Sequence, residues 1–74
     1  MKEQIVAECV ERYIEILKPN SAGQPSNLDS LTATDLAYAV SELTQLDFFE
    51  LVEKVTAEDL ETKDRFSTRL LEIL

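Results

Sequence analysis

Apolar side chains recur at intervals of three and four residues along most of this chain, and this spacing constrains the fold more than any other feature of the sequence. Residues with this spacing lie on one face of an α-helix. In the segment Lys2–Leu17 the apolar face consists of Val6, Val10, Tyr13, Ile14 and Leu17, with Ile5 and Cys9 beside them. Sustained alternation with a period of two, which indicates strands, is absent. The pattern predicts an all-α protein whose first helix spans residues 2–17.

One segment breaks the helical pattern. Pro19–Leu28 (PNSAGQPSNL) contains both prolines and the only glycine of the chain, together with serines and asparagines that favour turns. Proline cannot continue a helix, so the first helix is expected to end before Pro19. A loop of ten residues can cross the end of a helical bundle, and the two helices that it joins need not form a tight hairpin.

A second helix is predicted from Ser30 or Leu31 to Leu43. Its apolar face consists of Leu31, Ala33, Leu36, Ala39, Val40 and Leu43. Its start has two candidate caps. The Asp29 carboxylate can accept a hydrogen bond from a first-turn amide, and the segment Thr32–Asp35 has the spacing of a capping box.

Two further helices are predicted after a break at Thr44–Asp47. The apolar residues of the short third helix are Phe48, Phe49, Leu51, Val52 and Val55. Thr56–Asp59 again has capping-box spacing, and the last helix is expected to follow it. The apolar face of that helix consists of Phe66, Leu70, Ile73 and Leu74, with Leu60 and Leu71 nearby. Because four apolar faces can be buried only against one another, we expect a small four-helix bundle, a single domain over residues 1–74, with a long first loop and a short third helix.

The chain has few residues of the kinds that catalysis and metal binding use. It contains no histidine and one cysteine, Cys9, so neither an intramolecular disulfide nor a zinc or haem site is expected. A Ser-His-Asp or Cys-His nucleophile cannot be assembled for the same reason. Cys9 lies on the apolar face of its helix and is interpreted as a core residue, since no cation is placed to lower its pKa. We therefore expect a protein that is not an enzyme.

Acidic charge is concentrated in the middle of the chain. The formal net charge is −8, and residues 29–61 alone carry nine acidic residues against Lys54. This balance works against nucleic-acid binding, which depends on contacts from Lys and Arg to phosphates. A charged face can simply keep a small protein in solution. The segregation of the charge favours instead a docking surface that attracts basic partners.

The sequence also carries expectations about the cellular setting. No apolar run approaches the roughly 20 residues of a membrane span, and the N-terminus has no signal-peptide pattern. A free cysteine without a secretion signal indicates a reducing, cytoplasmic setting.

The residues Asn27-Leu28-Asp29-Ser30-Leu31 stand where the polar loop gives way to the second helix. A serine in the first turn of a helix can carry a covalent group into solvent, and a phosphodiester there would lie near unpaired amides and the positive end of the helix dipole. The chain has no histidine to activate Ser30, which suits modification by a separate enzyme. The same residues can equally be an ordinary helix start.

Asp29-Ser30-Leu31, followed by Asp35-Leu36, resembles the motif of the acyl and peptidyl carrier proteins. Their pattern is Gly-x-Asp-Ser-Leu at the head of a second helix that continues with an acid-leucine pair. The resemblance extends to the order of the helices over most of the chain, although only a short stretch matches in detail. In that family the serine hydroxyl receives 4′-phosphopantetheine from a separate transferase, and the thiol of this arm carries acyl, polyketide or aminoacyl chains as thioesters.

The resemblance implies roles for the residues of the motif. Ser30 would carry 4′-phosphopantetheine, Asp29 would help to orient the metal and the transferase during modification, and Leu31 would be an exposed apolar contact for partner enzymes. The acidic surface that such partners contact would consist of Asp35, Glu42, Asp47, Glu50 and Glu53. The implied partners are a phosphopantetheinyl transferase and acyl-chain-processing enzymes with basic docking patches. The protein itself is expected to be a monomer without a metal site.

The chain departs from the family pattern in several places. Asn27 stands at the position of the glycine, and asparagine adopts a left-handed backbone more readily than most residues. Phe48-Phe49 replaces the usual Ile-Pro after the second helix, and the chain from Thr56 to Phe66 is longer than the ordinary link to the last helix. These differences leave the register of the third and fourth helices open.

The competing function is an acidic helical docking module in which Ser30 is a plain helix N-cap. Phe48 and Phe49 would then be contact residues, although aromatic side chains are usually buried and the core is expected for both. For a carrier, the cargo stays open between fatty acyl, polyketide and aminoacyl chains. The acidic middle segment favours an acyl carrier over a peptidyl carrier.

Overall fold

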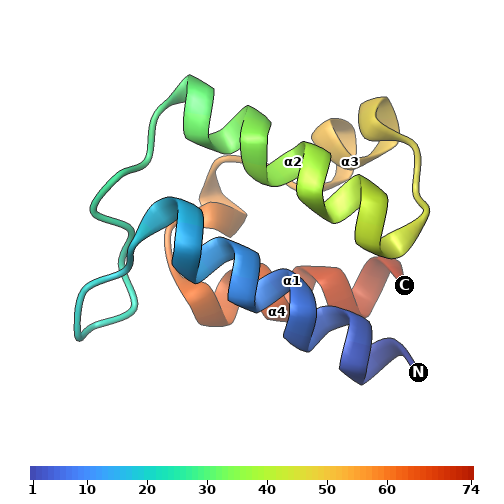
Figure 1. The fold of residues 1–74 in the computed structure, drawn as a ribbon, viewed down its shortest axis with the longest axis horizontal. Helices are drawn as coiled ribbons and strands as arrows, with labels where there is room; N and C mark the ends of the chain where they lie inside the picture. Colours follow the sequence, from blue (N-terminus) through green and yellow to red (C-terminus); the bar gives the residue numbers. More distant parts are fainter.

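The computed structural model describes all 74 residues as four α-helices and one turn of 3-10 helix. The elements are α1 (Lys2–Leu17), α2 (Ser30–Thr44), α3 (Phe48–Lys54), η1 (Glu58–Leu60) and α4 (Lys63–Ile73). α1 packs against both α2 and α4, α3 packs against α2, and η1 packs against α4 (Figure 1). The prediction of an all-α four-helix protein with a long first loop and a short third helix is confirmed. This small globule is compatible with the fold that the resemblance to carrier proteins implies.

The core lies between the helices and receives residues from every element. Its buried residues are Val6, Cys9, Tyr13, Leu17, Leu36, Val40, Leu51, Leu60, Phe66 and Leu70. Tyr13 and Phe66 stack with their ring centroids 5.0 Å apart, which joins α1 to α4. Burial, together with the neighbouring Glu8 carboxylate, raises the pKa of Cys9 to about 11. The interpretation of Cys9 as a core residue is confirmed.

The loop between α1 and α2 caps the end of α1. Lys18 adopts a left-handed backbone with φ 49° and ends the helix. The Asn27 N–H donates to the Leu17 carbonyl at 3.1 Å, and the Asn27 side-chain amide donates to the Ile16 carbonyl at 3.2 Å. Within the loop after Lys18 the positive φ belongs to Gly23, at 81°. Asn27 therefore contributes hydrogen bonds to the end of α1 and does not adopt the left-handed backbone that its position suggested.

The segment Thr56–Asp59 does not cap the last helix, in contrast to what its spacing predicts. The Asp59 carboxylate accepts hydrogen bonds from the Thr56 N–H at 2.9 Å and from the Thr56 hydroxyl at 3.2 Å, which closes the turn into η1. α4 begins only at Lys63, where Thr62 has an extended backbone and its hydroxyl accepts from the Arg65 N–H at 3.1 Å. Thr62 is therefore the residue that sets where the last helix starts.

The loop between α1 and α2 lies at one end of the molecule, and both termini lie at the other end (Figure 1). Ser30, the first residue of α2, is therefore at the loop end, away from the termini. None of the helices combines the length and the apolar composition that a membrane crossing requires.

Candidate functional site

The start of α2 is capped by a reciprocal pair of hydrogen bonds. Asp29 Oδ1 accepts from the Thr32 N–H at 2.9 Å, and Thr32 Oγ1 accepts from the Asp29 N–H at 2.9 Å. Of the two caps that the sequence allowed, the structure has the one at Asp29, and Thr32 completes it as a capping box. The hydrogen bond from the Thr32 N–H is the main reason why the pKa of the exposed Asp29 is lowered.

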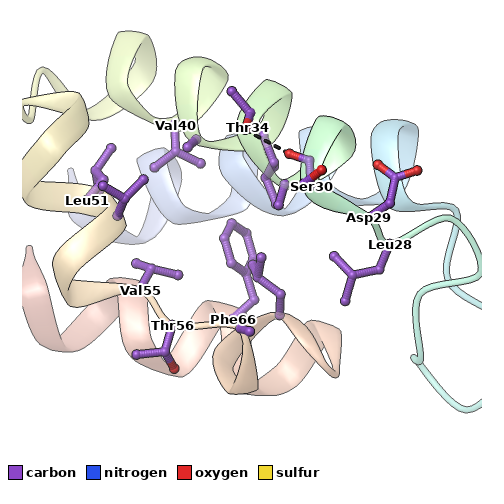
Figure 2. A pocket seen from close by; sticks show the side chains of 15 residues that line it. Leu28, Asp29, Ser30, Thr34, Val40, Leu51, Val55, Thr56 and Phe66 are labelled. Atoms are coloured by element: carbon purple, nitrogen blue, oxygen red, sulfur yellow. Dashed lines mark hydrogen bonds between the residues drawn. The ribbon is translucent and has the colours of Figure 1, made fainter.

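Ser30 is the first residue of α2 and is exposed to solvent. Its backbone carbonyl accepts a hydrogen bond from the Thr34 hydroxyl at 2.7 Å (Figure 2). Leu31, the next residue, is 75% exposed, as its expected role requires. The N-cap of α2 is Asp29, so the description of Ser30 as a plain N-cap is wrong. Because Ser30 and Leu31 are both exposed, another molecule can reach them.

An apolar cavity of about 330 Å³ lies directly beside Ser30. Of its 15 lining residues, 11 are hydrophobic, so its interior offers few hydrogen-bond partners. The hydrophobic residues that line it are Leu28, Ala33, Leu36, Ala37, Val40, Leu51, Val52, Val55, Ala57, Leu60 and Phe66. These residues come from α2, α3, η1, α4 and the connecting segments, so the cavity exists only in the assembled fold.

The cavity extends from the start of α2 toward its middle. Figure 2 shows Ser30 at one end, Val40 and Leu51 at the other, and the Phe66 ring projecting between them toward α2. On the α2 side, Ala33 and Ala37 lie one turn apart and line the cavity with small side chains. Larger side chains at these two positions would fill part of the cavity.

Buried hydrogen bonds fix the wall of the cavity that faces α2. The Tyr13 hydroxyl donates to the Leu60 carbonyl at 2.7 Å, and burial raises the pKa of this hydroxyl. Asp59 is only 6% exposed, and its Oδ2 also accepts from Arg69 Nε at 3.2 Å. Burial by itself raises the pKa of Asp59, but the donors on Thr56 and Arg69 outweigh burial and keep the pKa below its usual value. The segment around η1 is thus tied to both α1 and α4.

The five acids predicted to contact partners are all exposed, and none of them forms an ion pair within the protein. They are Asp35, Glu42, Asp47, Glu50 and Glu53. The five ion pairs of the structure are instead made by arginines of α1 and α4 with other acids. Asp47 also has a structural role, because its carboxylate caps α3 by accepting from the N–H groups of Phe49 at 3.0 Å and Glu50 at 3.2 Å.

Three aromatic rings form a continuous cluster where α2 and α3 meet. Tyr38 stacks on Phe48 with the ring centroids 4.4 Å apart, and Phe48 meets Phe49 edge-on at 5.5 Å. Phe48 is partly buried, but Tyr38 is 58% exposed and Phe49 is 72% exposed. The expectation that both phenylalanines belong to the core is wrong for Phe49. The short α3 buries only the face that carries Leu51, and a residue two positions away points to the other side.

Sequence reasoning missed the cavity itself and one residue of the aromatic cluster, Tyr38. The spacing of the apolar residues predicts faces to be buried, but not that a space beside Ser30 is left between them. Tyr38 was detectable, since it lies seven residues after Leu31 and therefore on the same face of α2.

Comparisons with known proteins find no match: no protein-family model, no curated protein and no solved structure matches this chain. The structure also contains no group of three or more His, Cys, Asp or Glu side chains placed to hold a metal ion.

Proposed function

We propose that the protein is an acyl carrier protein that holds acyl or polyketide intermediates as thioesters on a 4′-phosphopantetheine arm attached to Ser30. One observation carries this proposal: an exposed serine at the first position of α2 borders an apolar cavity of about 330 Å³. A flexible arm attached there can extend into solvent toward partner enzymes. It can also fold back and place an apolar chain in the cavity.

The residues around Ser30 suit such an arm. The first amides of α2 and the helix dipole favour negative charge at this position, as a phosphodiester requires. Asp29 uses Oδ1 to cap the helix, which leaves Oδ2 for the metal ion and the transferase that modify Ser30. When bound, the arm supplies a terminal thiol for thioester formation, and the exposed Leu31 supplies an apolar contact beside the attachment point.

The lining of the cavity favours acyl or reduced polyketide cargo over aminoacyl cargo. Each methylene group that leaves water for an apolar site contributes about 0.8 kcal/mol. An unpaired polar group in such a site costs about 1–3 kcal/mol, and an ammonium group costs more. The apolar part of the cavity therefore suits a hydrocarbon chain better than the ammonium group of an aminoacyl chain.

The proposed partners are a phosphopantetheinyl transferase and acyl-chain-processing enzymes with basic docking patches. The five exposed acids of α2, α3 and the residue before α3 have no internal cation, so they are available to arginines and lysines of such enzymes. We also propose that the protein acts as a monomer in the cytoplasm, where the free Cys9 stays reduced.

The test is modification of the full chain in vitro. Incubation with coenzyme A, magnesium and a broad-specificity phosphopantetheinyl transferase should raise the intact mass by one prosthetic arm. Ser30→Ala should abolish this gain, and Ser21→Ala, a matched change of an exposed serine in the preceding loop, should leave it intact. An unchanged mass with several transferases, for a chain shown to be folded, contradicts the proposal.

The competing function, an acidic docking module, is favoured by the exposure of Phe49 and Tyr38. The effect of Ser30→Ala distinguishes the two functions. A docking module binds its partner equally well after Ser30→Ala and loses binding after changes to the aromatic cluster. A carrier protein loses its cargo after Ser30→Ala.

A further inference from the structure

The exposed part of the aromatic cluster continues into a stripe of exposed residues along α2. Helical residues four and seven positions apart share a face, so Leu31, Asp35 and Tyr38 lie in one line, with Glu42 one turn beyond. On α3, Phe49 and Glu53 are also four residues apart and exposed. We define the aromatic–acidic face as Leu31, Asp35, Tyr38, Glu42, Phe49 and Glu53.

Ring contacts join the two helices' parts of this face. Phe48 lies between Tyr38 and Phe49, with centroid distances of 4.4 Å and 5.5 Å, so the rings form one unbroken apolar surface. Acids lie one turn from each exposed ring: Glu42 follows Tyr38, and Glu53 follows Phe49. Each exposed ring therefore has a carboxylate beside it on its own helix.

The negative charge of the face is not neutralised within the protein. None of its three carboxylates appears in any of the five ion pairs. Lys54 is the only cation between residues 29 and 61. The face thus combines exposed π-surfaces with unpaired negative charge, a combination that suits a flat, cationic group.

We propose that the aromatic–acidic face binds arginine side chains of a basic protein partner. A guanidinium can stack on the Tyr38 or Phe49 ring while its N–H groups donate to Glu42 or Glu53. Lysine presents a compact, strongly hydrated ammonium that cannot stack or donate as a planar fork, so the face distinguishes arginine from lysine. A second copy of this chain does not fit, because a symmetric contact would bring two unpaired acidic faces together and like charges repel.

This inference deepens the proposed docking of basic partners and rests on it, but it does not depend on the attachment proposed at Ser30. Tyr38 lies eight residues after Ser30, which is about 12 Å along the axis of α2. One partner can therefore contact the face and act at Ser30 at the same time. Because the test uses the unmodified chain, failure of one proposal leaves the other standing.

The test measures binding of two helical peptides by calorimetry at low salt. One peptide carries arginines and leucines on one face, and its twin carries lysine in place of every arginine. We expect the arginine peptide to bind the full chain at least about three- to five-fold more tightly than the lysine peptide. Tyr38→Ala and Phe49→Ala should each weaken arginine binding by roughly three- to five-fold and should change lysine binding little.

Three controls make the outcome decisive. Leu71→Ala, which removes a partly exposed apolar side chain from α4, should leave both affinities unchanged. Ser30→Ala should also leave them unchanged. Circular dichroism should show that the variants stay folded, since the altered side chains are exposed.

Equal affinity for the two peptides, no binding of either, or equal effects of Phe49→Ala and Leu71→Ala overturns the proposal. A dimer that sedimentation detects and Phe49→Ala dissolves assigns the face to self-association and overturns it as well.

Discussion

Asp59 is a carboxylate that folding removes almost completely from water. An ionised group in such a place needs donors, and Asp59 obtains them from the N–H and hydroxyl of Thr56 and from the guanidinium of Arg69. These donors come from the turn into η1 and from α4, so one side chain connects two parts of the chain. The lowered pKa of Asp59 means that the ionised form stabilises the folded state.

We expect Asp59→Asn to lower the free energy of unfolding at pH 7 by about 1–3 kcal/mol, because a charged hydrogen-bond acceptor is lost from a buried site. The pKa of Asp59 is lower in the folded protein than in the unfolded chain. Its contribution is therefore present above the unfolded value, about 3.9, and is lost as the pH falls through the folded value. Urea unfolding followed by circular dichroism at pH 7 and at pH 3 tests this.

The difference in the free energy of unfolding between the wild type and Asp59→Asn should be clearly smaller at pH 3 than at pH 7. Asp35→Asn, which changes an exposed acid without an ion pair, should have little effect at either pH. A destabilisation by Asp59→Asn of equal size at both pH values would show that packing, and not charge, explains it.

Among the elements, η1 depends most on contacts outside itself. It is a single turn of three residues, too short to be stable alone, yet it forms a wall of the cavity beside Ser30. The Tyr13 hydroxyl of α1 donates to the Leu60 carbonyl across 47 positions of sequence. The position of this wall therefore depends in part on α1, the element most distant from it along the chain.

Tyr13→Phe should lower the free energy of unfolding by about 1 kcal/mol, since it removes one buried hydrogen bond and leaves the Leu60 carbonyl without this donor. Hydrogen exchange should also become faster in residues 56–61. Tyr38→Phe is the matched control, because it removes the hydroxyl of an exposed tyrosine. Similar effects of the two substitutions would contradict the role of the Tyr13 hydroxyl.

The apolar cavity between the elements leads to a separate prediction about the cargo. If the arm on Ser30 is loaded with an octanoyl chain, the protein should be more stable than with an acetyl group by at least about 1 kcal/mol, because methylenes enter the cavity. Ala37→Leu fills part of the cavity and should reduce this gain without lowering the stability of the unloaded protein. Thermal unfolding of the wild type and of Ala37→Leu, each unloaded and loaded with acetyl or octanoyl, measures the gain. A gain in stability of the same size in Ala37→Leu would show that the octanoyl chain lies outside the cavity.

Over the whole molecule, positive and negative charges are unevenly distributed. Residues 29–61 carry the excess of acids, and the arginines of α4 pair with Glu58, Asp59 and Glu61 but with no acid of α2 or α3. α2 and α3 therefore repel each other electrostatically while their apolar faces pack. Because the carboxylates of these two helices have no internal cation, they can bind cationic groups of a partner.

Raising the sodium chloride concentration from about 10 mM to 500 mM should increase Tm, because salt screens repulsion between exposed charges. A gain of about 1 kcal/mol corresponds to roughly 4–8 °C for a domain of this size. Glu50→Gln combined with Glu53→Gln should reduce the salt dependence, and Glu8→Gln combined with Glu11→Gln on α1 should reduce it less. A Tm that falls with salt would mean that attraction between charges outweighs repulsion.

Local features of the fold could be predicted from the sequence. The bounds of the first helix, Lys2–Leu17, follow from helical periodicity and proline chemistry, and the Asp29 cap of α2 is one of the two caps that the sequence allowed. The exposure of Ser30 also follows from its place at the start of a helix, whereas the spacing put Leu31 on the apolar face and only the family resemblance implied its exposure. These properties depend on neighbours within a few positions, and such neighbours are known once the sequence is known.

Only the tertiary structure decided what the helices enclose and what they leave in solvent. The Thr56–Asp59 spacing predicted a helix cap, but the Asp59 carboxylate is drawn into a buried contact with Arg69 and closes a turn instead. Phe49 is exposed because α3 has room to bury one face only, and the cavity beside Ser30 exists because three other elements meet opposite α2. The physical reason is the same in each case: burial is a property of the contacts between elements, and spacing along the chain does not specify those contacts.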